Sequence, residues 1–504
     1  MKQSAASLVR RLWQYCSILR DDGLSYPDYV EQLTYLLFLK MADERKHSPV
    51  PQEYSWASFA GMSAKELHRH YAVVLEALGR RDGTLGLIFH NARNKIKDPA
   101  KLRLLVENLI GQTDWGALSP DVKGDAYEGL LEKNAQDTKS GAGQYFTPRV
   151  LIDAIVQCVQ PKLGEVVCDP ACGTGGFLLS SHEYLRKVHP KLSAAQERHL
   201  STRAFRGVEL VEEVARLATM NLFLHGIGDR VSDADLPIVC DDSLKRPITA
   251  KVDIVLTNPP FGTRGSVTFT HGDKNSDSDE LVVMRPEFWV KTANKQLNFL
   301  QHVVSMLAPN GRAAIVLPDN VLFESGAAEV IRRHLFATHD VHTLLRLPTG
   351  LFYAQGVKAN VLFFDKVPVS DRKRAKQVLW VYNLRDTRIS LKNNPLRRED
   401  LQDFVAAFSP GNRVARKEQS TRGCAAKWRC FDTADIVAGE GCRLDLEWGE
   451  MKRGRSTQVR VELEEMAALI AMDLTTALKH ISSMSSSGTA GSTVRNKGSV
   501  TRGR

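Results

Sequence analysis

The sequence lacks a long apolar run and is poor in cysteine, and each absence narrows the class of protein. No apolar stretch reaches the roughly 18 residues that a membrane-spanning helix needs, and the N-terminus has basic residues but no signal-peptide core. We therefore expect a cytoplasmic protein without a membrane partner. Only 8 cysteines occur in 504 residues, and Cys424, Cys430 and Cys442 lack paired C-x-x-C spacing. This pattern argues against disulfides and against a structural metal site.

Acidic residues are missing from the last 23 residues, 482–504, which contain four basic side chains. This segment contributes +4 of the formal net charge of +10. The remaining excess is compatible with a nucleic-acid partner but too mild to establish one. The Ser, Gly and Arg content of 483–504 predicts a disordered basic tail.

Hydrophobic spacing divides the rest of the chain into a helical part and an alternating part. Leu8, Leu12, Cys16 and Leu19 recur at helical intervals, and residues 1–135 are predicted to be helical. Farther along, apolar segments typical of strands alternate with helical ones; they are 165–168, 204–208, 237–240, 252–257, 311–317, 341–347 and 359–365. This alternation predicts an α/β fold with a doubly wound, mostly parallel sheet.

The segment 252–261 is typical of a buried strand that ends in a rigid polar corner. Pro259 and Pro260 fix the backbone and remove two amide donors. The Asn258 side-chain oxygen and the Pro259 carbonyl then remain as acceptors, and Phe261 adds a flat aromatic ring. Two acceptors beside an aromatic ring suit an amino group on a planar base, so these four residues are the candidate catalytic residues.

A glycine-rich turn follows an earlier strand. Asp169 lies at the strand end, and Gly173, Thr174, Gly175 and Gly176 lead into a predicted helix. Glycines permit close approach of the backbone to a ligand, and a helix start offers free amide groups. The turn lacks the Gly-Lys-Ser/Thr of an ATP-binding loop, and leucine stands where a dinucleotide fingerprint needs its third glycine. A nicotinamide dehydrogenase is therefore disfavoured, but it stays an alternative.

Two further acids and a helix start add candidate binding residues. Glu209 ends a short strand one β-α unit after the glycine turn, where a carboxylate can reach ribose hydroxyls. A solvated strand-end acid is the alternative. Asp242 is a candidate ligand contact or an ordinary turn acid. Thr147 and Pro148 predict the start of a helix, with Thr147 as its N-cap.

These motifs together resemble those of a known family. Asn-Pro-Pro-Phe is similar to the catalytic motif of methyltransferases that act on adenine N6, and the glycine turn resembles the S-adenosyl-L-methionine loop of class I methyltransferases. The segment that resembles the one closing over this cofactor consists of Gln144, Tyr145, Phe146, Thr147, Pro148 and Arg149. Other matching segments are 221–226, 317–323 and 345–357. The chain thus resembles the modification (M) subunit of type I restriction-modification systems.

The resemblance implies a class I methyltransferase that methylates adenine N6 in double-stranded DNA, with the base flipped into a pocket at residues 258–261. The implied cofactor is S-adenosyl-L-methionine, bound by residues 144–149, the glycine turn, Asp169, Glu209 and Asp242. The implied partners are a specificity (S) subunit, which carries two copies of this chain, and a restriction (R) subunit.

The expected organisation follows from the same resemblance. It comprises a helical N-terminal domain over 1–135, a catalytic domain over 136–400, a C-terminal region with a partner-binding helix over 401–482, and the basic tail over 483–504. An antiparallel hairpin is implied at the last strands. The polar segment 262–279 is either a DNA-contacting loop or a plain surface loop. RNA or a protein glutamine amide as methyl acceptor, and a non-enzymatic scaffold, remain alternatives.

Overall fold

The computed structural model describes most of the first 446 residues. The described residues are 5–20, 23–44, 48–113, 115, 127, 129–130, 147–228, 236–245, 250–261, 285–352, 358–367, 378–385, 387, 389, 394–418 and 427–446. Residues Met1–Asp445 form one compact unit, to which every element below belongs. The predicted loop 262–279, the partner-binding helix after 446 and the basic tail lie outside the described residues.

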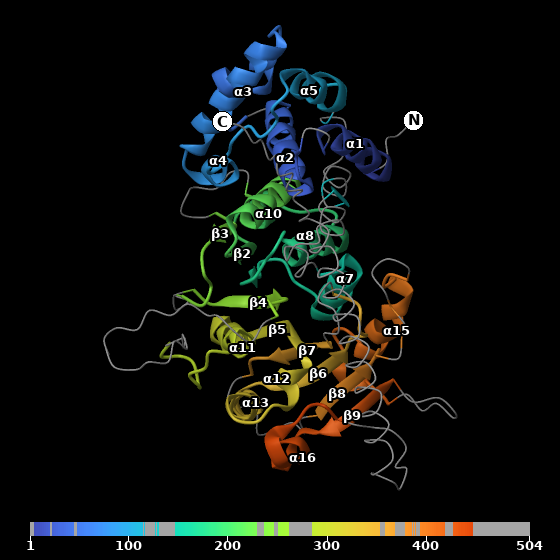
Figure 1. The fold of residues 1–504 in the computed structure, drawn as a ribbon. Helices are drawn as coiled ribbons and strands as arrows, with labels where there is room; N and C mark the ends of the chain where they lie inside the picture. The colour runs from blue at the N-terminus through green and yellow to red at the C-terminus, as the bar shows by residue number, and fades with distance from the viewer. Residues whose placement is uncertain are drawn as a thin grey trace, which may run out of the picture. The chain divides into compact units, whose positions relative to one another are not determined.

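Helices form the described N-terminal part, as the hydrophobic spacing predicted (Figure 1). They are α1 (Ala5–Arg20), α2 (Tyr26–Asp43), η1 (Gln52–Tyr54), η2 (Trp56–Phe59), α3 (Ala64–Gly79), α4 (Gly83–Phe89), α5 (Pro99–Leu104) and η3 (Leu105–Ile110). Leu8, Leu12, Cys16 and Leu19 lie on α1 and are at most 2% exposed. The 3.6-residue period therefore identified the buried face of this helix correctly.

A nine-stranded sheet forms the rest of the described fold. Its strands are β1 (Val167–Asp169), β2 (Phe205–Glu209), β3 (Ile238–Cys240), β4 (Val252–Thr257), β5 (Leu307–Pro318), β6 (Asp340–Arg346), β7 (Ala359–Asp365), β8 (Val378–Asn383) and β9 (Trp428–Asp432). Their order is β3-β2-β1-β4-β5-β7-β6-β8-β9. The neighbours from β3 to β5 pair in parallel, which confirms the predicted doubly wound, mostly parallel sheet.

The last part of the sheet contains the antiparallel strand that the family resemblance implied. Strand β7 lies between β5 and β6 and runs antiparallel to both. Strands β8 and β9 extend this edge and were not predicted. The boundary expected at residue 400 falls inside helix α15 (Arg398–Phe408), whose Phe404 is buried in the same core as Trp428 of β9.

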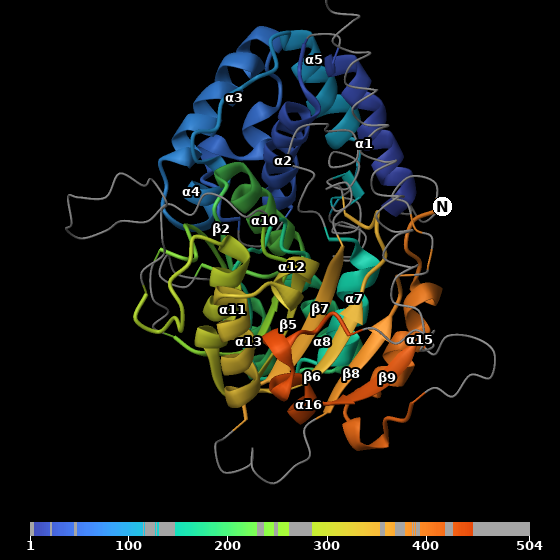
Figure 2. The ribbon, with the colours of Figure 1, turned by 60° about the horizontal axis from the view of Figure 1, so that its bottom comes forward.

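Helices cover both faces of the sheet (Figure 2). One layer contains α7 (Arg149–Val159), α8 (Gly176–Val188) and α15, and the other contains α11 (Lys295–Met306), α13 (Ala327–Thr338) and α16 (Thr433–Ala438). The remaining helices are α9 (Ala194–Thr202), α10 (Glu212–Leu224), α12 (Asp319–Phe323), η6 (Arg413–Ala415) and η7 (Glu440–Cys442). With both faces covered, the central strands are buried, as their apolar sequences require.

The one acid inside the buried strand β4 has a local role. Asp253 accepts a hydrogen bond from the backbone amide of Val166, just before β1, at 2.9 Å. This bond adds a side-chain link between β4 and the residue before β1. It also gives the Val166 amide a hydrogen-bond partner.

Within the described part of the chain, no helix is both long and apolar enough to cross a membrane. The same residues contain no group of three or more His, Cys, Asp or Glu side chains that could hold a metal ion.

Candidate functional site

The candidate residues meet at the carboxyl ends of three neighbouring strands. Strand β1 lies between β2 and β4, with Asp169 paired to Gly207 and Cys168 paired to Val255. Asp169 therefore ends β1 beside the last residues of β4, and Asn258 follows β4 directly. Glu209 ends β2 on the other side. Parallel strands bring their carboxyl ends to one edge of the sheet, which is where open α/β sheets bind ligands.

The Asn258 side chain is buried, with 7% of its surface exposed, and is held at one end only. Its Nδ2 donates a hydrogen bond to Thr147 Oγ1 at 2.8 Å. Its Oδ1 is buried without a hydrogen-bond partner among the described residues. A buried acceptor without a partner is costly, so a ligand donor that reaches Asn258 Oδ1 would be stabilised there.

The bond to Asn258 explains why the predicted N-cap is wrong. Helix α7 starts at Arg149, with Pro148 in the N-cap position and no side-chain cap. The Thr147 hydroxyl contacts Asn258 instead of the helix amides. A tertiary contact thus replaced the local capping bond that the Thr-Pro sequence favours.

Phe261 contributes an aromatic wall to the residues 258–261, which we call the acceptor corner. Its ring packs edge-to-face against Phe352, with centroids 5.4 Å apart and planes at 83°. Phe352 is 3% exposed and Phe261 is partly buried. Phe352 lies in the matching segment 345–357, but nothing in the sequence alone showed that it would contact Phe261.

The glycine turn between β1 and α8 depends on close packing. Gly173 and Gly175 have φ values of 53° and 84°, in the left-handed region that favours glycine. A Cβ on Gly175 would lie 2.6 Å from Leu222 Cδ1, and a Cβ on Gly176 would lie 2.8 Å from Ile152 Cδ1. The turn therefore needs glycine at 173 and 175 for its backbone conformation, and added Cβ atoms at 175 and 176 would displace the ends of the Leu222 and Ile152 side chains.

Two carboxylates flank this turn, the buried Asp169 and the half-buried Glu209. Glu209 accepts hydrogen bonds from the amides of Gly173, at 3.0 Å, and Val211, at 2.9 Å. Asp169 is 1% exposed and accepts from the Ala171 amide at 3.0 Å. Burial raises the pKa of Asp169 to about 7, although the hydrogen bond from the Ala171 amide opposes the shift. Burial also raises the pKa of Glu209.

Asp242 lies at the same edge, after β3. It accepts a hydrogen bond from the Leu244 amide at 2.9 Å, as an ordinary turn acid does. The next residue, Ser243, donates its hydroxyl to the Pro170 carbonyl and so links this turn to the residues that follow Asp169. The structure thus places Asp242 near the glycine turn and leaves both of its predicted roles open.

The segment that was expected to close over the cofactor is described only in part. Gln144, Tyr145 and Phe146 lie outside the described residues. The Arg149 guanidinium forms ion pairs with Asp153 at 3.2 Å and with Glu183 at 2.6 Å.

Exposed apolar side chains lie beside Glu209, and the sequence analysis did not single them out. Leu210 is 62% exposed, Val211 is 47% exposed and Val239 is 49% exposed. Val239 of β3 pairs with Val208 of β2, so it lies close to Glu209 and to the Leu210 and Val211 that follow it. Apolar groups beside a carboxylate are suited to a ligand with a flat ring and hydroxyl groups, because each part of the ligand finds a matching surface.

The fold and the order of these motifs agree with a methylase. Residues 118–427, more than half of the chain, match the N-6 DNA Methylase family, and residues 8–109 match the HsdM N-terminal domain. These matches place the chain among the enzymes that methylate the N6 amino group of adenine in DNA.

Similar proteins narrow the class further. The chain is 37% identical to the type I restriction enzyme EcoKI methylase subunit of Escherichia coli strain K12, with 95% of this chain and 94% of that protein covered. The chain therefore belongs to the family of type I restriction enzyme methylase subunits, the adenine-specific DNA methyltransferases of class EC 2.1.1.72.

Solved structures agree with this assignment. The crystal structure of the EcoKI M protein matches with a TM-score of 0.52 and 32% identity, and covers 94% of this chain and 96% of that one. A chain from a structure of a type I R-M system has a TM-score of 0.70 at 24% identity, with 95% and 99% covered, which shows a shared fold.

Proposed function

We propose that this chain transfers a methyl group from S-adenosyl-L-methionine to adenine N6 in double-stranded DNA, and that residues 258–261 bind the flipped base. One observation carries the proposal: Asn258 Oδ1 is a buried acceptor without a partner among the described residues, at the end of β4. An amino proton of a flipped adenine supplies the missing donor.

The acceptor corner acts on the base in two ways. Extrusion of the base from the duplex costs a few kcal/mol, and stacking on Phe261 returns about 1–3 kcal/mol. Hydrogen bonds from the amino group to Asn258 Oδ1 and to the Pro259 carbonyl favour a tetrahedral nitrogen, which frees the lone pair for attack. These acceptors also face the positive charge that grows on the nitrogen, so they stabilise the transition state most. No strong base is needed before attack.

The residues around the glycine turn fit the cofactor, which supplies the reactive methyl group when bound. Glu209 is placed to accept hydrogen bonds from ribose hydroxyls, and Leu210 and Val239 offer apolar contacts to an adenine ring. Asp169 lies at the end of β1, toward the amino-acid part of the ligand. A cationic group there would return its carboxylate to the charged form. Asp242 and the segment 144–149 complete the proposed binding set.

The proposed assembly follows the type I pattern. Two copies of this chain bind one specificity (S) subunit, which reads the DNA sequence, and a restriction (R) subunit joins as a further partner. Residues 1–135 contact the S subunit and DNA, and the helix within 401–482 adds a partner contact. The enzyme works in the cytoplasm, where host DNA is its substrate.

The test is methyl transfer from labelled S-adenosyl-L-methionine to unmethylated DNA, by the full chain alone and by the chain co-expressed with its S subunit. We expect N6-methyladenine only from the complex. Methylation by the chain alone would contradict the S-subunit requirement. Transfer to neither sample, with cofactor bound, would replace DNA by RNA or protein as the methyl acceptor.

A further inference from the structure

Helix α10 is shared between two hydrophobic cores. Its Met220, Phe223 and Leu224 are buried among the N-terminal helices. Its Ala218 and Leu222 are buried with the helices and strands of the catalytic sheet. Figure 1 shows α10 between the N-terminal helices and strands β2 and β3, and it contacts α2 and α4 on one side and both strands on the other. A helix that is apolar on two sides is held by both neighbours, so movement on one side is felt on the other.

On the catalytic side, α10 contacts the glycine turn directly. Asn221, which is 1% exposed, donates from Nδ2 to the Thr174 carbonyl at 3.1 Å. The next residue, Leu222, packs where a Cβ on Gly175 would be. Two adjacent residues of α10 therefore set the position of two adjacent residues of the turn. This gives a structural role to the segment 221–226, which the sequence analysis matched without explaining.

On the N-terminal side, a buried ion pair holds the helix. Arg216 is 3% exposed, and its guanidinium contacts Glu31 of α2 at 2.5 Å. It also donates to the carbonyl of His90 at 2.7 Å. Lys95 contacts the other Glu31 oxygen at 2.6 Å, so the carboxylate is shared by two cations. A buried guanidinium with these partners has one stable position, because any displacement leaves a charge unpaired.

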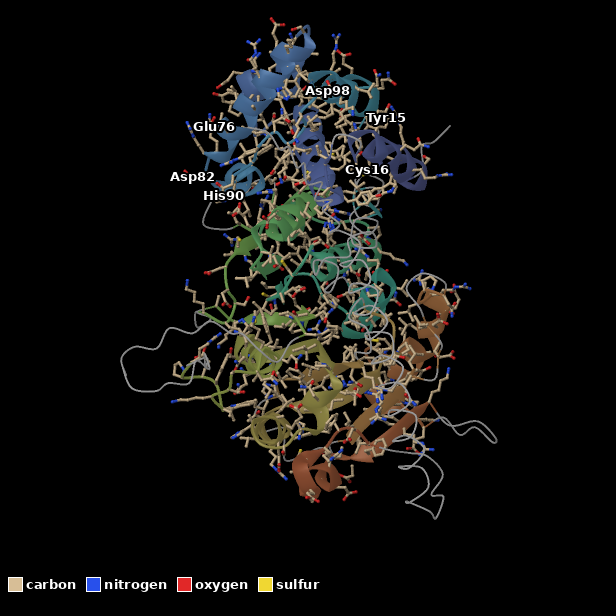
Figure 3. The ribbon with its side chains drawn as sticks, viewed as in Figure 1. Tyr15, Cys16, Glu76, Asp82, His90 and Asp98 are labelled. Atoms are coloured by element: carbon tan, nitrogen blue, oxygen red, sulfur yellow. The ribbon has the colours of Figure 1, made fainter. Side chains whose placement is uncertain are left out.

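The start of α10 also has contacts with both the N-terminal helices and the residues around the glycine turn. The His90 ring, at the end of α4 (Figure 3), contacts Glu212 at 2.7 Å. One residue earlier, the Val211 amide donates to Glu209, the same carboxylate that receives the Gly173 amide. The contacts thus run from α4 through α10 to the carboxylate beside the glycine turn.

We propose that α10 makes cofactor affinity depend on the packing of the N-terminal helices, with Asn221 as the residue that positions the glycine turn and Arg216 as the anchor. The inference rests on the proposed binding of S-adenosyl-L-methionine at this turn. Neither residue is a catalytic residue, since both act through Thr174 and the helix backbone.

The first variant is Asn221→Leu, which keeps the side chain branched at Cγ and removes the bond to Thr174. Binding of S-adenosyl-L-methionine to the full chain is measured by calorimetry. We expect the Kd to rise about tenfold, with the KM for the cofactor raised in the assembled enzyme and the KM for DNA unchanged. Thr219→Val is the matched control, because the Thr219 hydroxyl donates to the Ala215 carbonyl of the same helix and not to the glycine turn. It should leave the Kd unchanged.

The second variant is Arg216→Met, with Arg312→Met as its control. Arg312 also forms an arginine–glutamate pair, with Glu165 at 2.8 Å, which is less buried and lies away from α10. Both changes should lower the unfolding midpoint, but only Arg216→Met should raise the Kd, by about fivefold. Glu31→Gln, a milder break of the same pair, replaces Arg216→Met if that variant does not fold.

The outcomes separate this inference from the proposed function. Absence of cofactor binding by the unmodified chain would defeat the proposed function itself. Normal binding by the unmodified chain together with an unchanged Kd in Asn221→Leu would overturn the positioning role. Equal increases in Kd for Arg216→Met and Arg312→Met would show a general stability effect and overturn the anchor.

Discussion

The glycine turn and the acceptor corner lie at the ends of adjacent strands, yet they handle buried polar groups differently. The turn is flanked by two carboxylates whose oxygens accept backbone amides, and whose pKa values burial raises. The corner instead uses a neutral amide, with one end bonded to Thr147 and the other without a partner among the described residues. The glycine turn can therefore recognise a ligand by its charge, whereas the acceptor corner can recognise one by hydrogen bonding alone.

The comparison agrees with the tasks that we propose for the two sides. A charged cofactor can be recognised by groups that gain or lose a proton. A neutral adenine needs fixed acceptors, since a carboxylate that titrates near pH 7 would make the acceptor strength vary with pH. Substitutions at the glycine turn should therefore change the cofactor Kd, and substitutions at the acceptor corner should change the rate of methyl transfer.

The largest expected effect comes from Asn258→Ala. It removes the acceptor for the amino group, so methyl transfer should fall about 10³-fold, in line with the loss of a transition-state hydrogen-bonding group. The Kd for the cofactor should stay within about twofold, since Asn258 belongs to the other side of the site. Single-turnover methylation and calorimetry measure the two quantities. Normal turnover would remove Asn258 from catalysis.

Gly175→Val should act on the cofactor side. The change forces an unfavourable φ of 84° and a clash with Leu222. Both effects distort the turn that is proposed to hold the cofactor, so we expect the cofactor to bind about 100-fold more weakly, the equivalent of about 3 kcal/mol of binding free energy. Gly164→Val is the control, because Gly164 also has a positive φ, of 92°, but nothing within 4 Å of its added Cβ. Equal losses in both variants would show that backbone strain, not the turn, is responsible.

Asp169 should make the stability of the cofactor-free protein depend on pH. Its pKa is raised from 3.8 to about 7 by burial, so the folded state binds a proton that the unfolded state has released in this range. Stability should therefore decrease as pH rises from about 4 to about 7. Asp169→Asn should remove ~2 kcal/mol of the difference in unfolding free energy between about pH 5 and about pH 7.5. An unaltered pH dependence in the urea denaturation of this variant would contradict the shift.

The smallest effect is expected for Thr147→Val. This change leaves the Asn258 Nδ2 without its hydrogen bond, and the amide loses its fixed orientation. We expect kcat to fall about tenfold, the equivalent of about 1.4 kcal/mol, and the cofactor Kd to change less than kcat, although Thr147 also belongs to the proposed binding segment 144–149. A higher Kd with unchanged kcat would instead limit Thr147 to the cofactor-binding role that the family resemblance implied.

The sequence predicted those parts of the fold in which the local pattern and the tertiary environment agree. The predicted segment 252–257 is β4 itself, because a buried parallel strand is apolar throughout. Strands β8 and β9 escaped prediction, since β9 is short and only partly buried and depends on pairing with a distant segment. The predicted Thr147 cap was wrong for a similar reason, because its partner Asn258 follows the distant strand β4.

The site residues divide in the same way, into those that the local sequence pattern predicts and those that depend on contacts between distant segments. The sequence predicted where the glycines, Asp169 and Glu209 lie, because the glycine turn and both acids come at the ends of strands that the local pattern already predicts. Asn221 and Phe352 were within segments that matched the family, but only the folded structure shows that they contact Thr174 and Phe261. Roles that depend on contact between distant segments could not be read from the order of the residues.

The shared helix α10 has a consequence for synthesis of the chain. The N-terminal helices complete their apolar core with Met220, Phe223 and Leu224, about one hundred residues after η3 ends at Ile110. At roughly 5–20 residues per second, a ribosome needs about 5–20 s to make the intervening segment. During that time the first helices leave the ribosome with an apolar surface still uncovered, and the nascent chain offers a binding site for chaperones until α10 emerges.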